Sequence, residues 1–432
     1  MRGAGFAIYV HIPICAHKCY YCDFHSRPVK SEDRNRYLRA LGQEIRESRW
    51  KGDRAQTLFL GGGTPSELTG DEIEAIIQAL EDTFDFASDS EWTIECNPGT
   101  VSPAACDRLL ELGFDRISLG VQSFQDHHLK RLGRIHSAED ALQSYEWFRG
   151  AGFENVSLDL MFGLPDQTVK EWREDLKRAL QLGPEHLSLY SLSIEPGTPF
   201  GHLLEVGALP EASDDLVADM YEMAMDLMQE AGYGQYEISN YALPGYECVH
   251  NLAYWTNSPY LGFGISAASY ADGFRWTNTC DWEAYFEGAE KGVIPSASLE
   301  RLQWNLAMGE EIMLGLRMGQ GISTNRLSGK YRCDFERLFR LSINFLTEQS
   351  LLARDGDRLL LTRRGKLLAN EVCSEFLKSA RAISPDPTAS LQQIEFPHVE
   401  GANLAPSPTP RAGRTRLDGK DPDDHSAQAG RR

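Results

Sequence analysis

The sequence contains no long apolar run and no secretory signal. No segment reaches the roughly 18 consecutive apolar residues that suggest a membrane-spanning helix. Met1–Gly5 leads directly into the apolar run Phe6–Val10, without the regions that make up a signal peptide. We therefore predict a cytoplasmic protein without a membrane span.

Positive charge is also scarce. The chain has 43 Lys and Arg against 63 Asp and Glu, which gives a formal net charge of −20 and a pI near 5.0. Non-specific binding to nucleic acid depends on a basic surface. We therefore expect neither DNA nor RNA as a partner, and we attribute the acidity mainly to solubility.

The cysteines do not form the framework of a secreted disulfide-rich domain. Their number, nine, is odd, and six of them are scattered along the chain: Cys96, Cys106, Cys248, Cys280, Cys333 and Cys373. Disulfide frameworks need paired cysteines and an oxidising compartment. The distribution instead fits a reducing cytoplasm.

The remaining three cysteines form the most informative pattern in the chain. Cys15, Cys19 and Cys22 have the spacing C-x3-C-x2-C. Three thiolates can hold three irons of a [4Fe–4S] cluster and leave the fourth iron open for a small molecule. A structural zinc site or an electron-transfer cluster normally has four protein ligands, and no fourth cysteine lies nearby. The spacing predicts an open cluster; the alternative is three unconnected thiols, or a disulfide and one thiol.

Strand-like and helix-like segments alternate from residue 6 to about residue 195. The predicted strands are Phe6–Val10, Thr57–Leu60, Trp92–Glu95, Arg116–Val121, Val156–Met161 and Leu187–Leu192. The predicted helices include Arg34–Arg49, Asp71–Phe84, Pro103–Leu112, Ala138–Phe148 and Val169–Leu182. This alternation predicts an α/β fold with a parallel sheet. Six repeats favour an open (β/α)6 barrel, and a doubly wound sheet is the alternative.

The rest of the chain differs in character from this barrel, which we assign to residues 1–200. Residues 201–298 form a less regular extension. Residues 299–380 are predicted to be a small, mainly helical domain that resembles a winged helix, with a hairpin at residues 351–361. We expect this domain to serve packing rather than DNA binding. Residues 381–432 are rich in proline and polar residues and are predicted to be a disordered tail.

Glycine and polar residues occur at the ends of several predicted strands. Gly62, Gly63 and Thr64 follow the second strand, and Glu95 ends the third. Ligands collect at the carboxyl ends of parallel strands. Glycine allows close approach, and backbone N–H groups there are expected to bind polar ligand atoms, although a tight turn is the alternative. Glu95 is predicted to accept hydrogen bonds from ribose hydroxyls.

A second set of polar residues is expected at the same edge of the sheet. Gln122 follows the fourth strand, Arg134 lies shortly after it, and Asp159 is in the fifth. A guanidinium suits the carboxylate of a ligand. Each residue alone would more often be structural, but together they favour ligand binding.

The segment His250–Trp255 lies in the less regular region. An exposed histidine beside Tyr254 and Trp255 is able to ligate haem iron while the rings cover the porphyrin. A lone histidine is more often a hydrogen-bonding loop residue, and the two aromatics are more often core residues. These residues alone leave both interpretations open.

Six motifs together resemble the HemN/HemW group of radical S-adenosylmethionine (SAM) proteins: HIPICAHKCYYCDF, GGGTPSEL, IECNPG, GVQSFQD, LDLMFGLP and HNLAYW. The resemblance extends from about Ala7 to Leu377. It implies a radical SAM barrel with a HemN-type C-terminal domain. By this resemblance, the cluster ligands are Cys15, Cys19 and Cys22, and the contacts to cluster-bound SAM are Tyr9, Gly62 and Glu95. The positions that match contacts to a second SAM are Tyr21, Gly63, Thr64, Gln122, Arg134 and Asp159.

Three differences favour the HemW branch of this group over the oxygen-independent coproporphyrinogen III oxidases. The oxidase pattern continues to a further cysteine, whereas Asp23 and Phe24 follow Cys22 here. The oxidases also carry a long segment before the barrel. Finally, HNLAYW matches the HNxxYW motif associated with haem binding in HemW.

The resemblance thus implies a haem chaperone. It would bind haem near His250 and deliver it to apo-haemoproteins, including respiratory proteins at a membrane. Whether SAM is cleaved, and so whether the protein is an enzyme, is left open. The alternatives are coproporphyrinogen decarboxylation and radical SAM chemistry on another substrate.

Overall fold

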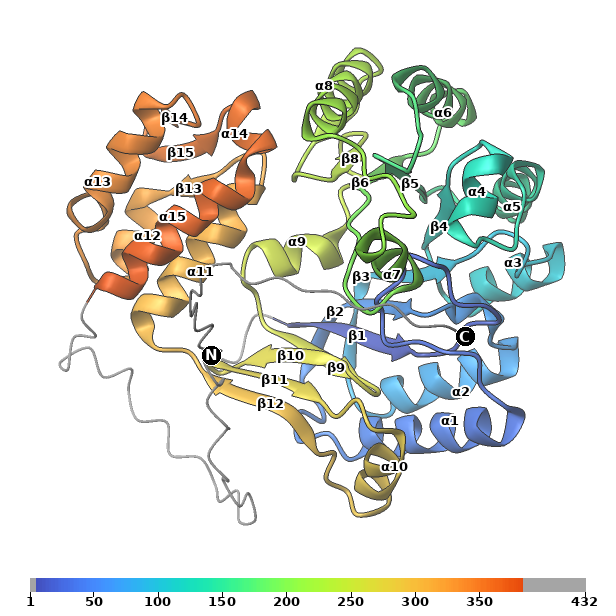
Figure 1. The fold of residues 1–432 in the computed structure, drawn as a ribbon. Coiled ribbons are helices and arrows are strands. Elements are labelled where there is room, and N and C mark those ends of the chain that lie inside the picture. Colours follow the sequence, from blue (N-terminus) through green and yellow to red (C-terminus); the bar gives the residue numbers. More distant parts are fainter. Residues whose placement is uncertain (1–4, 384–432) are drawn as a thin grey trace, which may run out of the picture. The chain divides into compact units, whose positions relative to one another are not determined.

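The computed structural model describes residues 5–383, and a parallel sheet dominates them (Figure 1). The parallel strands are β1 (Phe6–Ile12), β2 (Arg54–Gly62), β3 (Asp85–Cys96), β4 (Arg116–Gln122), β5 (Val156–Phe162), β6 (His186–Ser191) and β9 (Tyr260–Phe263). Their runs of buried aliphatic residues explain this, because a parallel sheet is covered on both faces. Ile8 and Val10 in β1, and Leu58 and Leu60 in β2, have no solvent exposure.

Helices connect these strands. They are α1 (Ser31–Arg46), η1 (Pro65–Glu67), α2 (Gly70–Glu81), α3 (Pro103–Glu111), α4 (Asp126–Leu132), α5 (Ala138–Ala151), α6 (Val169–Leu182), α7 (Pro199–Glu205) and α8 (Asp214–Glu230). Their starts follow sequence signals. Capping boxes begin α2, α5 and α6, where the side chain of Thr69, Ser137 or Thr168 accepts from the third helical amide. The predicted α/β fold with a parallel sheet is confirmed.

The region expected to be less regular instead extends the sheet. It contains β7 (Gly234–Gln235), β8 (Asn240–Ala242), α9 (Val249–Trp255), β10 (Ala268–Ala271), β11 (Phe274–Asn278), α10 (Trp282–Glu290) and β12 (Ser296–Arg301). The sheet order is β12-β11-β10-β9-β1-β2-β3-β4-β5-β6-β8-β7, and no pairing within residues 5–383 joins its two ends. The barrel is therefore open, and β9 adds a parallel strand beside β1.

The segment Gln235–Tyr241 does not form one continuous strand, although its apolar and aromatic residues predict one. This segment is split into β7 and β8, which pair antiparallel with Gly234 opposite Ala242. Between them the chain turns, and the Glu237 carboxylate accepts from the Ser239 amide at 2.8 Å. A side chain that binds its own turn favours reversal over extension.

The C-terminal region is mainly helical and has a separate hydrophobic core. Its elements are α11 (Trp304–Arg317), β13 (Ile322–Ser323), α12 (Thr324–Tyr331), α13 (Phe335–Glu348), β14 (Leu352–Asp355), β15 (Arg358–Leu361), α14 (Arg363–Leu367) and α15 (Ala369–Ala382). Phe335, Phe339 and Phe376 are fully buried in its core. The predicted hairpin is present as β14 and β15, with Gly356 at φ +57° in the turn. The tail predicted for residues 381–432 lies, apart from its first three residues, outside the described residues.

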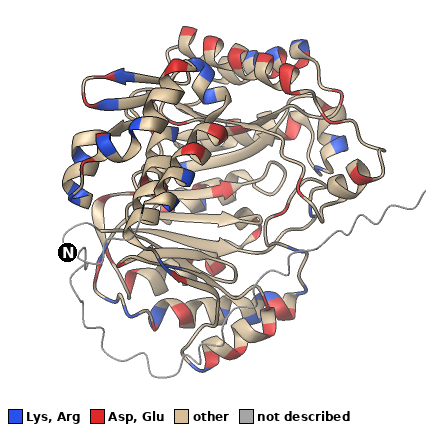
Figure 2. Ribbon diagram, turned by 60° about the vertical axis from the view of Figure 1, so that its left-hand side comes forward, with Lys and Arg blue, Asp and Glu red and all other residues tan. Residues whose placement is uncertain are grey.

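Charges lie mainly on the helices. Figure 2 shows acidic and basic residues interspersed along them, whereas the strands carry few charges. No helix in the described part of the chain is both long and apolar enough to cross a membrane.

Candidate functional site

The three motif cysteines lie in the segment between β1 and α1, immediately after the carboxyl end of β1. Cys15 is buried, Cys19 and Cys22 are half-buried, and none of the three forms a disulfide within residues 5–383. The amide of Cys15 donates to the Arg27 carbonyl at 3.2 Å, and that of Cys22 donates to the Cys19 carbonyl at 3.3 Å. These two backbone hydrogen bonds hold the conformation of the loop that contains all three thiols.

A chain of side-chain hydrogen bonds joins two of these thiols to the ends of neighbouring strands. The Thr64 hydroxyl donates to the Cys15 sulfur at 3.5 Å, and the Asn97 amide donates to Thr64 Oγ1 at 2.9 Å. Arg134 donates to Asn97 Oδ1 at 2.7 Å and to the Cys19 sulfur at 3.6 Å. The chain Cys15–Thr64–Asn97–Arg134–Cys19 thus fixes two sulfurs against the ends of β2 and β3.

Burial and charge act differently on the groups of this site. Burial raises the pKa of the Cys15 and Cys22 thiols. Burial alone would lower the pKa of Arg134, but the neighbouring Tyr21 and Cys19 raise it. A permanent guanidinium charge therefore lies beside the Cys19 sulfur and the Tyr21 hydroxyl.

Close packing at the carboxyl end of β2 requires the glycines there. A Cβ on Gly63 would lie 2.5 Å from the Ile14 carbonyl oxygen, and one on Gly62, at φ +112°, would lie 2.5 Å from the His11 ring. The N–H groups expected to bind a ligand have partners within the protein. Gly62 donates to Glu95 Oε2 at 2.8 Å, and Gly63 donates to the Ile12 carbonyl at 2.7 Å. These bonds hold the segment in place.

Glu95 and Tyr9 lie beside this glycine segment. Burial raises the pKa of the Glu95 carboxyl to about 7. The Tyr9 hydroxyl donates to His11 Nδ1 at 3.0 Å, because His11 Nε2 must carry the proton that it donates to the His25 carbonyl at 2.9 Å. Burial lowers the pKa of His11 to about 4, so its ring is neutral at pH 7.

Asp159 and Gln122 come from the next two strands. Asp159 accepts from the Ser118 hydroxyl at 2.8 Å, and Ser118 lies opposite Glu95 in the register of β3 and β4. Burial raises the pKa of Asp159. Gln122 ends β4 with φ +67°, and its side chain, like those of Asn97 and Arg134, lies against Gly120. The strand-end residues expected from sequence therefore gather along one edge of the sheet.

Sequence reasoning did not single out Asn97, the central link of the hydrogen-bond chain. Its signal was present, because it is a polar residue two positions after Glu95 at the end of β3. Its partners Thr64 and Arg134 are far away in sequence, so only the fold reveals the contact.

The predicted exposed position of His250 is wrong. Only 1% of this residue is exposed, and burial lowers its pKa to about 3. Its Nδ1 lies 2.7 Å from Thr57 Oγ1, and its Nε2 lies 3.0 Å from the Tyr254 hydroxyl. The ring also stacks on Phe59 with centroids 4.9 Å apart. Both ring nitrogens therefore already have partners.

The helix that carries His250 is anchored at both ends. At its start, Glu91 accepts from the amides of Val249 and His250 at 3.1 and 3.0 Å. At its end, the guanidinium of Arg317 from α11 lies 4.9 Å from the ring centroid of Trp255. In Figure 1, α9 lies beside the C-terminal helices accordingly. The HNLAYW segment thus links the sheet to the C-terminal region.

Two family models match the chain: the radical SAM superfamily over residues 9–179 and the HemN C-terminal domain over residues 306–368. The fold is similar to that of the coproporphyrinogen III oxidase HemN of Escherichia coli, with a TM-score of 0.77 and 24% identity over 86% of this chain and 90% of that one.

Several sequence relatives share one name. The chain is 40% identical to "Heme chaperone HemW" of Bacillus subtilis over 85% of this chain and 98% of that protein. It is 41% identical to the protein of the same name from Escherichia coli, over 65% of this chain and 76% of that one. These similarities agree with the cysteine loop, the strand-end residues and the C-terminal region, and the chain belongs to the HemW family of radical SAM proteins.

Proposed function

We propose that the protein binds haem and transfers it to apo-haemoproteins, and that it carries a [4Fe–4S] cluster and SAM. The main support for a cluster at this site is the hydrogen-bond chain Cys15–Thr64–Asn97–Arg134–Cys19. The haem function is supported by the name of the relatives that the chain matches over most of its length.

The cysteine loop fits a cluster with one open iron. Cys15, Cys19 and Cys22 would be its ligands, and donors from Thr64 and Arg134 already reach two of the sulfurs. Hydrogen bonds to the sulfurs are one of the factors that set the reduction potential of such clusters. A bound cluster would supply an electron to SAM, while the residues around it position and shield the site.

The residues around the loop fit SAM in a specific way. The amides of Gly62 and Gly63 donate within the protein, so we assign their carbonyl oxygens, rather than their N–H groups, to the SAM ammonium. Glu95 would accept from ribose hydroxyls, and Tyr9 would line the same site. A second SAM would lie against Tyr21, Gly63, Thr64, Gln122, Arg134 and Asp159.

His250 remains a proposed haem ligand, but because it is buried, its ring must first lose a hydrogen bond. Its Nε2 can reach iron only after it leaves the Tyr254 hydroxyl, while Nδ1 keeps Thr57. Ligation would therefore include movement of the Tyr254 side chain away from the imidazole, because both residues lie on α9. The alternative role of His250 is to hold α9 in place, so that haem binds nearby on other groups.

Anaerobic haem titration of cluster-loaded protein, followed by visible absorption, tests both the function and this ligand. We expect saturable binding near one haem per chain. If His250 ligates iron, His250→Ala should weaken binding, whereas Tyr254→Phe, which frees Nε2, should preserve or strengthen it. An equal loss of haem affinity in both variants would indicate that His250 has a structural role instead. Vinyl porphyrins formed from coproporphyrinogen III without haem binding would instead support the oxidase function.

The recipients are proposed to be apo-haemoproteins, including respiratory proteins at a membrane, and the compartment is proposed to be the cytoplasm. All nine cysteines are free and lie within the described residues, which is typical of a reducing compartment.

A further inference from the structure

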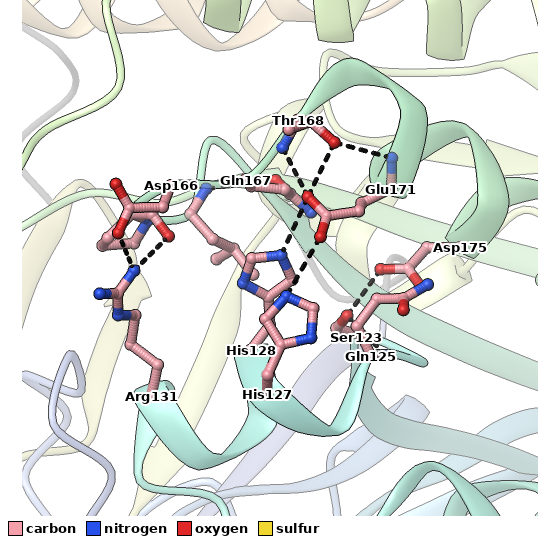
Figure 3. A network of polar contacts seen from close by, with 12 residues as sticks. Ser123, Gln125, His127, His128, Arg131, Asp166, Gln167, Thr168, Glu171 and Asp175 are labelled. Carbon is pink, nitrogen blue, oxygen red and sulfur yellow. Dashed lines mark hydrogen bonds and ion pairs between the residues drawn. The ribbon is translucent and has the colours of Figure 1, made fainter.

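Two consecutive histidines lie at a helix contact that the proposed function does not use. His127 and His128 are in the first turn of α4, directly after the GVQSFQD motif, and Glu171 is in the first turn of α6. Figure 3 shows both imidazole rings directed toward the Glu171 carboxylate. Their ring centroids are 4.0 Å apart.

The potential ligand atoms converge. His127 Nε2 lies 3.2 Å from Glu171 Oε1, and His128 Nε2 lies 3.6 Å from Glu171 Oε2. Each residue has one such atom within 4.8 Å of the other two, and no other group of three or more His, Cys, Asp or Glu in residues 5–383 does so. A tetrahedral ion with bonds of about 2.0–2.2 Å separates its ligand atoms by about 3.3–3.6 Å. The two separations between histidine and carboxylate, each to a different carboxylate oxygen, are close to that spacing.

His128 provides an independent observation. Its side chain is 1% exposed, yet neither ring nitrogen has a hydrogen-bond partner among the described residues. A buried polar group without a partner costs free energy, and such groups are rare in folded proteins. At 3.6 Å its Nε2 is too far from Glu171 for a hydrogen bond but suitably placed to share an ion with it.

The charges around the group suit a cation. Burial lowers the pKa of His128, and a neutral imidazole is the form that binds metal. Burial opposes ionisation of Glu171, but hydrogen bonds from Thr168 hold its pKa below the ordinary value. The amide and hydroxyl of Thr168 both donate to Glu171 Oε2 at 2.8 Å and so orient the carboxylate.

The charge of Arg131, which acts on His128, is already paired. Arg131, one turn further along α4, binds the Asp166 carboxylate and donates to the Pro165 carbonyl at 2.9 Å. Figure 3 shows its guanidinium directed to Asp166, away from the histidines. Its charge is therefore largely compensated at the site.

We propose that His127, His128 and Glu171 bind one divalent transition-metal ion of the zinc class, which fastens α4 to the start of α6. Two imidazoles and a carboxylate form a ligand set typical of zinc, and the 61% exposed side chain of His127 leaves a further position open to water. Because α4 leads into Arg134, the ion would also steady the segment that reaches the Cys19 sulfur.

Zinc titration by calorimetry tests this site in the full chain. The cluster must be loaded first, because empty cysteine thiolates also bind zinc, and adventitious metal is removed with a chelator. We expect one zinc per chain, and at least tenfold weaker binding in His127→Ala and in Glu171→Gln. Glutamine also serves at this capping-box position, so Glu171→Gln should keep α6 intact.

His202→Ala is the matched control. His202 is also an exposed histidine beside a carboxylate, with its Nδ1 3.5 Å from Glu205 Oε2, but the pair is not part of a three-residue group. Zinc binding should be unchanged in this variant. Zinc binding that is absent from the wild type, or that persists unchanged in His127→Ala and Glu171→Gln, would overturn the proposal.

His128→Leu separates metal binding from folding. In chelator, this variant should unfold at the same temperature as the wild type or higher, because leucine removes a buried polar ring without partners. Zinc should raise the midpoint of the wild type and leave that of the variant unchanged. A zinc-dependent rise of equal size in both proteins would contradict the site.

Discussion

At the scale of single residues, the cysteine sulfurs of this chain do not depend on their loop alone. Cys15 receives a hydrogen bond from Thr64, and Cys19 receives one from Arg134. Both donors are held by Asn97. A cluster bound here would therefore be oriented by residues that follow β2, β3 and α4 as well as by the loop.

Removal of one motif cysteine should abolish the cluster. In Cys19→Ala only two of the three thiolates remain, so we expect loss of the visible absorption and of most of the iron after anaerobic reconstitution. Cys280→Ala is the control, because Cys280 is an exposed cysteine outside the motif. A Cys19→Ala protein with the iron content of the wild type would refute the ligand assignment.

The ionisation of Glu95 should make SAM binding depend on pH. Its pKa is raised to about 7, so the carboxylate is mostly protonated at pH 6 and mostly ionised at pH 8. Protonation removes acceptor capacity. We expect SAM affinity to fall by up to about tenfold from pH 8 to pH 6 in cluster-loaded protein.

Glu95→Gln supplies the comparison for this pH dependence. Its SAM affinity should be weaker than that of the wild type at pH 8, and the part of the pH profile due to Glu95 should be lost. Identical pH profiles for the two proteins, measured by equilibrium dialysis, would show that Glu95 does not bind SAM.

At the scale of elements, α9 depends on one buried carboxylate. Glu91 accepts from two backbone amides at the start of the helix and from the Cys248 thiol at 3.4 Å, and it is 9% exposed. It also faces Arg116, which is 2% exposed. Loss of Glu91 would leave the amides and this guanidinium without their partner.

Glu91→Ala should therefore lower the free energy of unfolding by about 2–4 kcal/mol. Glu283→Ala, which removes a surface ion pair with Arg36, should cost at most about 1 kcal/mol. Chemical denaturation of both variants measures the difference. A loss below about 1 kcal/mol for Glu91→Ala would contradict the anchoring role of this residue.

The elements also show what sequence alone can predict. The six barrel strands and their helices were predictable, because apolar runs and capping residues are local signals. The strand-end site was also predictable, because parallel strands bring their carboxyl ends together. The pairing of β9 with β1 was not, because β9 has four residues and its partner lies about 250 positions earlier.

The burial of His250 was not predictable from the sequence for a related reason. Its partner Thr57 is 193 positions away, and the carboxylate of Glu91 that holds its backbone is 159 positions away. The local sequence HNLAYW does not indicate either contact. Burial of a motif residue is set by tertiary packing, which local composition does not report.

At the scale of the whole molecule, the described residues contain a sheet core and a second core in the C-terminal region. Composition predicts that the terminal segment adds to neither core. Deletion of residues 384–432 should therefore change the free energy of unfolding by less than about 0.5 kcal/mol. A larger loss in chemical denaturation, or loss of haem binding, would show that the segment contributes to the folded protein.

Haem transfer is the most direct test of the proposed function. Haem-loaded, cluster-containing protein is mixed anaerobically with an apo-haemoprotein, and the spectrum of the acceptor is followed. We predict that haem moves to the acceptor. Protein that lacks haem should give no spectrum of haem-loaded acceptor. Haem-loaded protein without the cluster should transfer haem more slowly or not at all. Haem that stays on the protein, or that reaches the acceptor no faster than free haem does, would contradict a chaperone function.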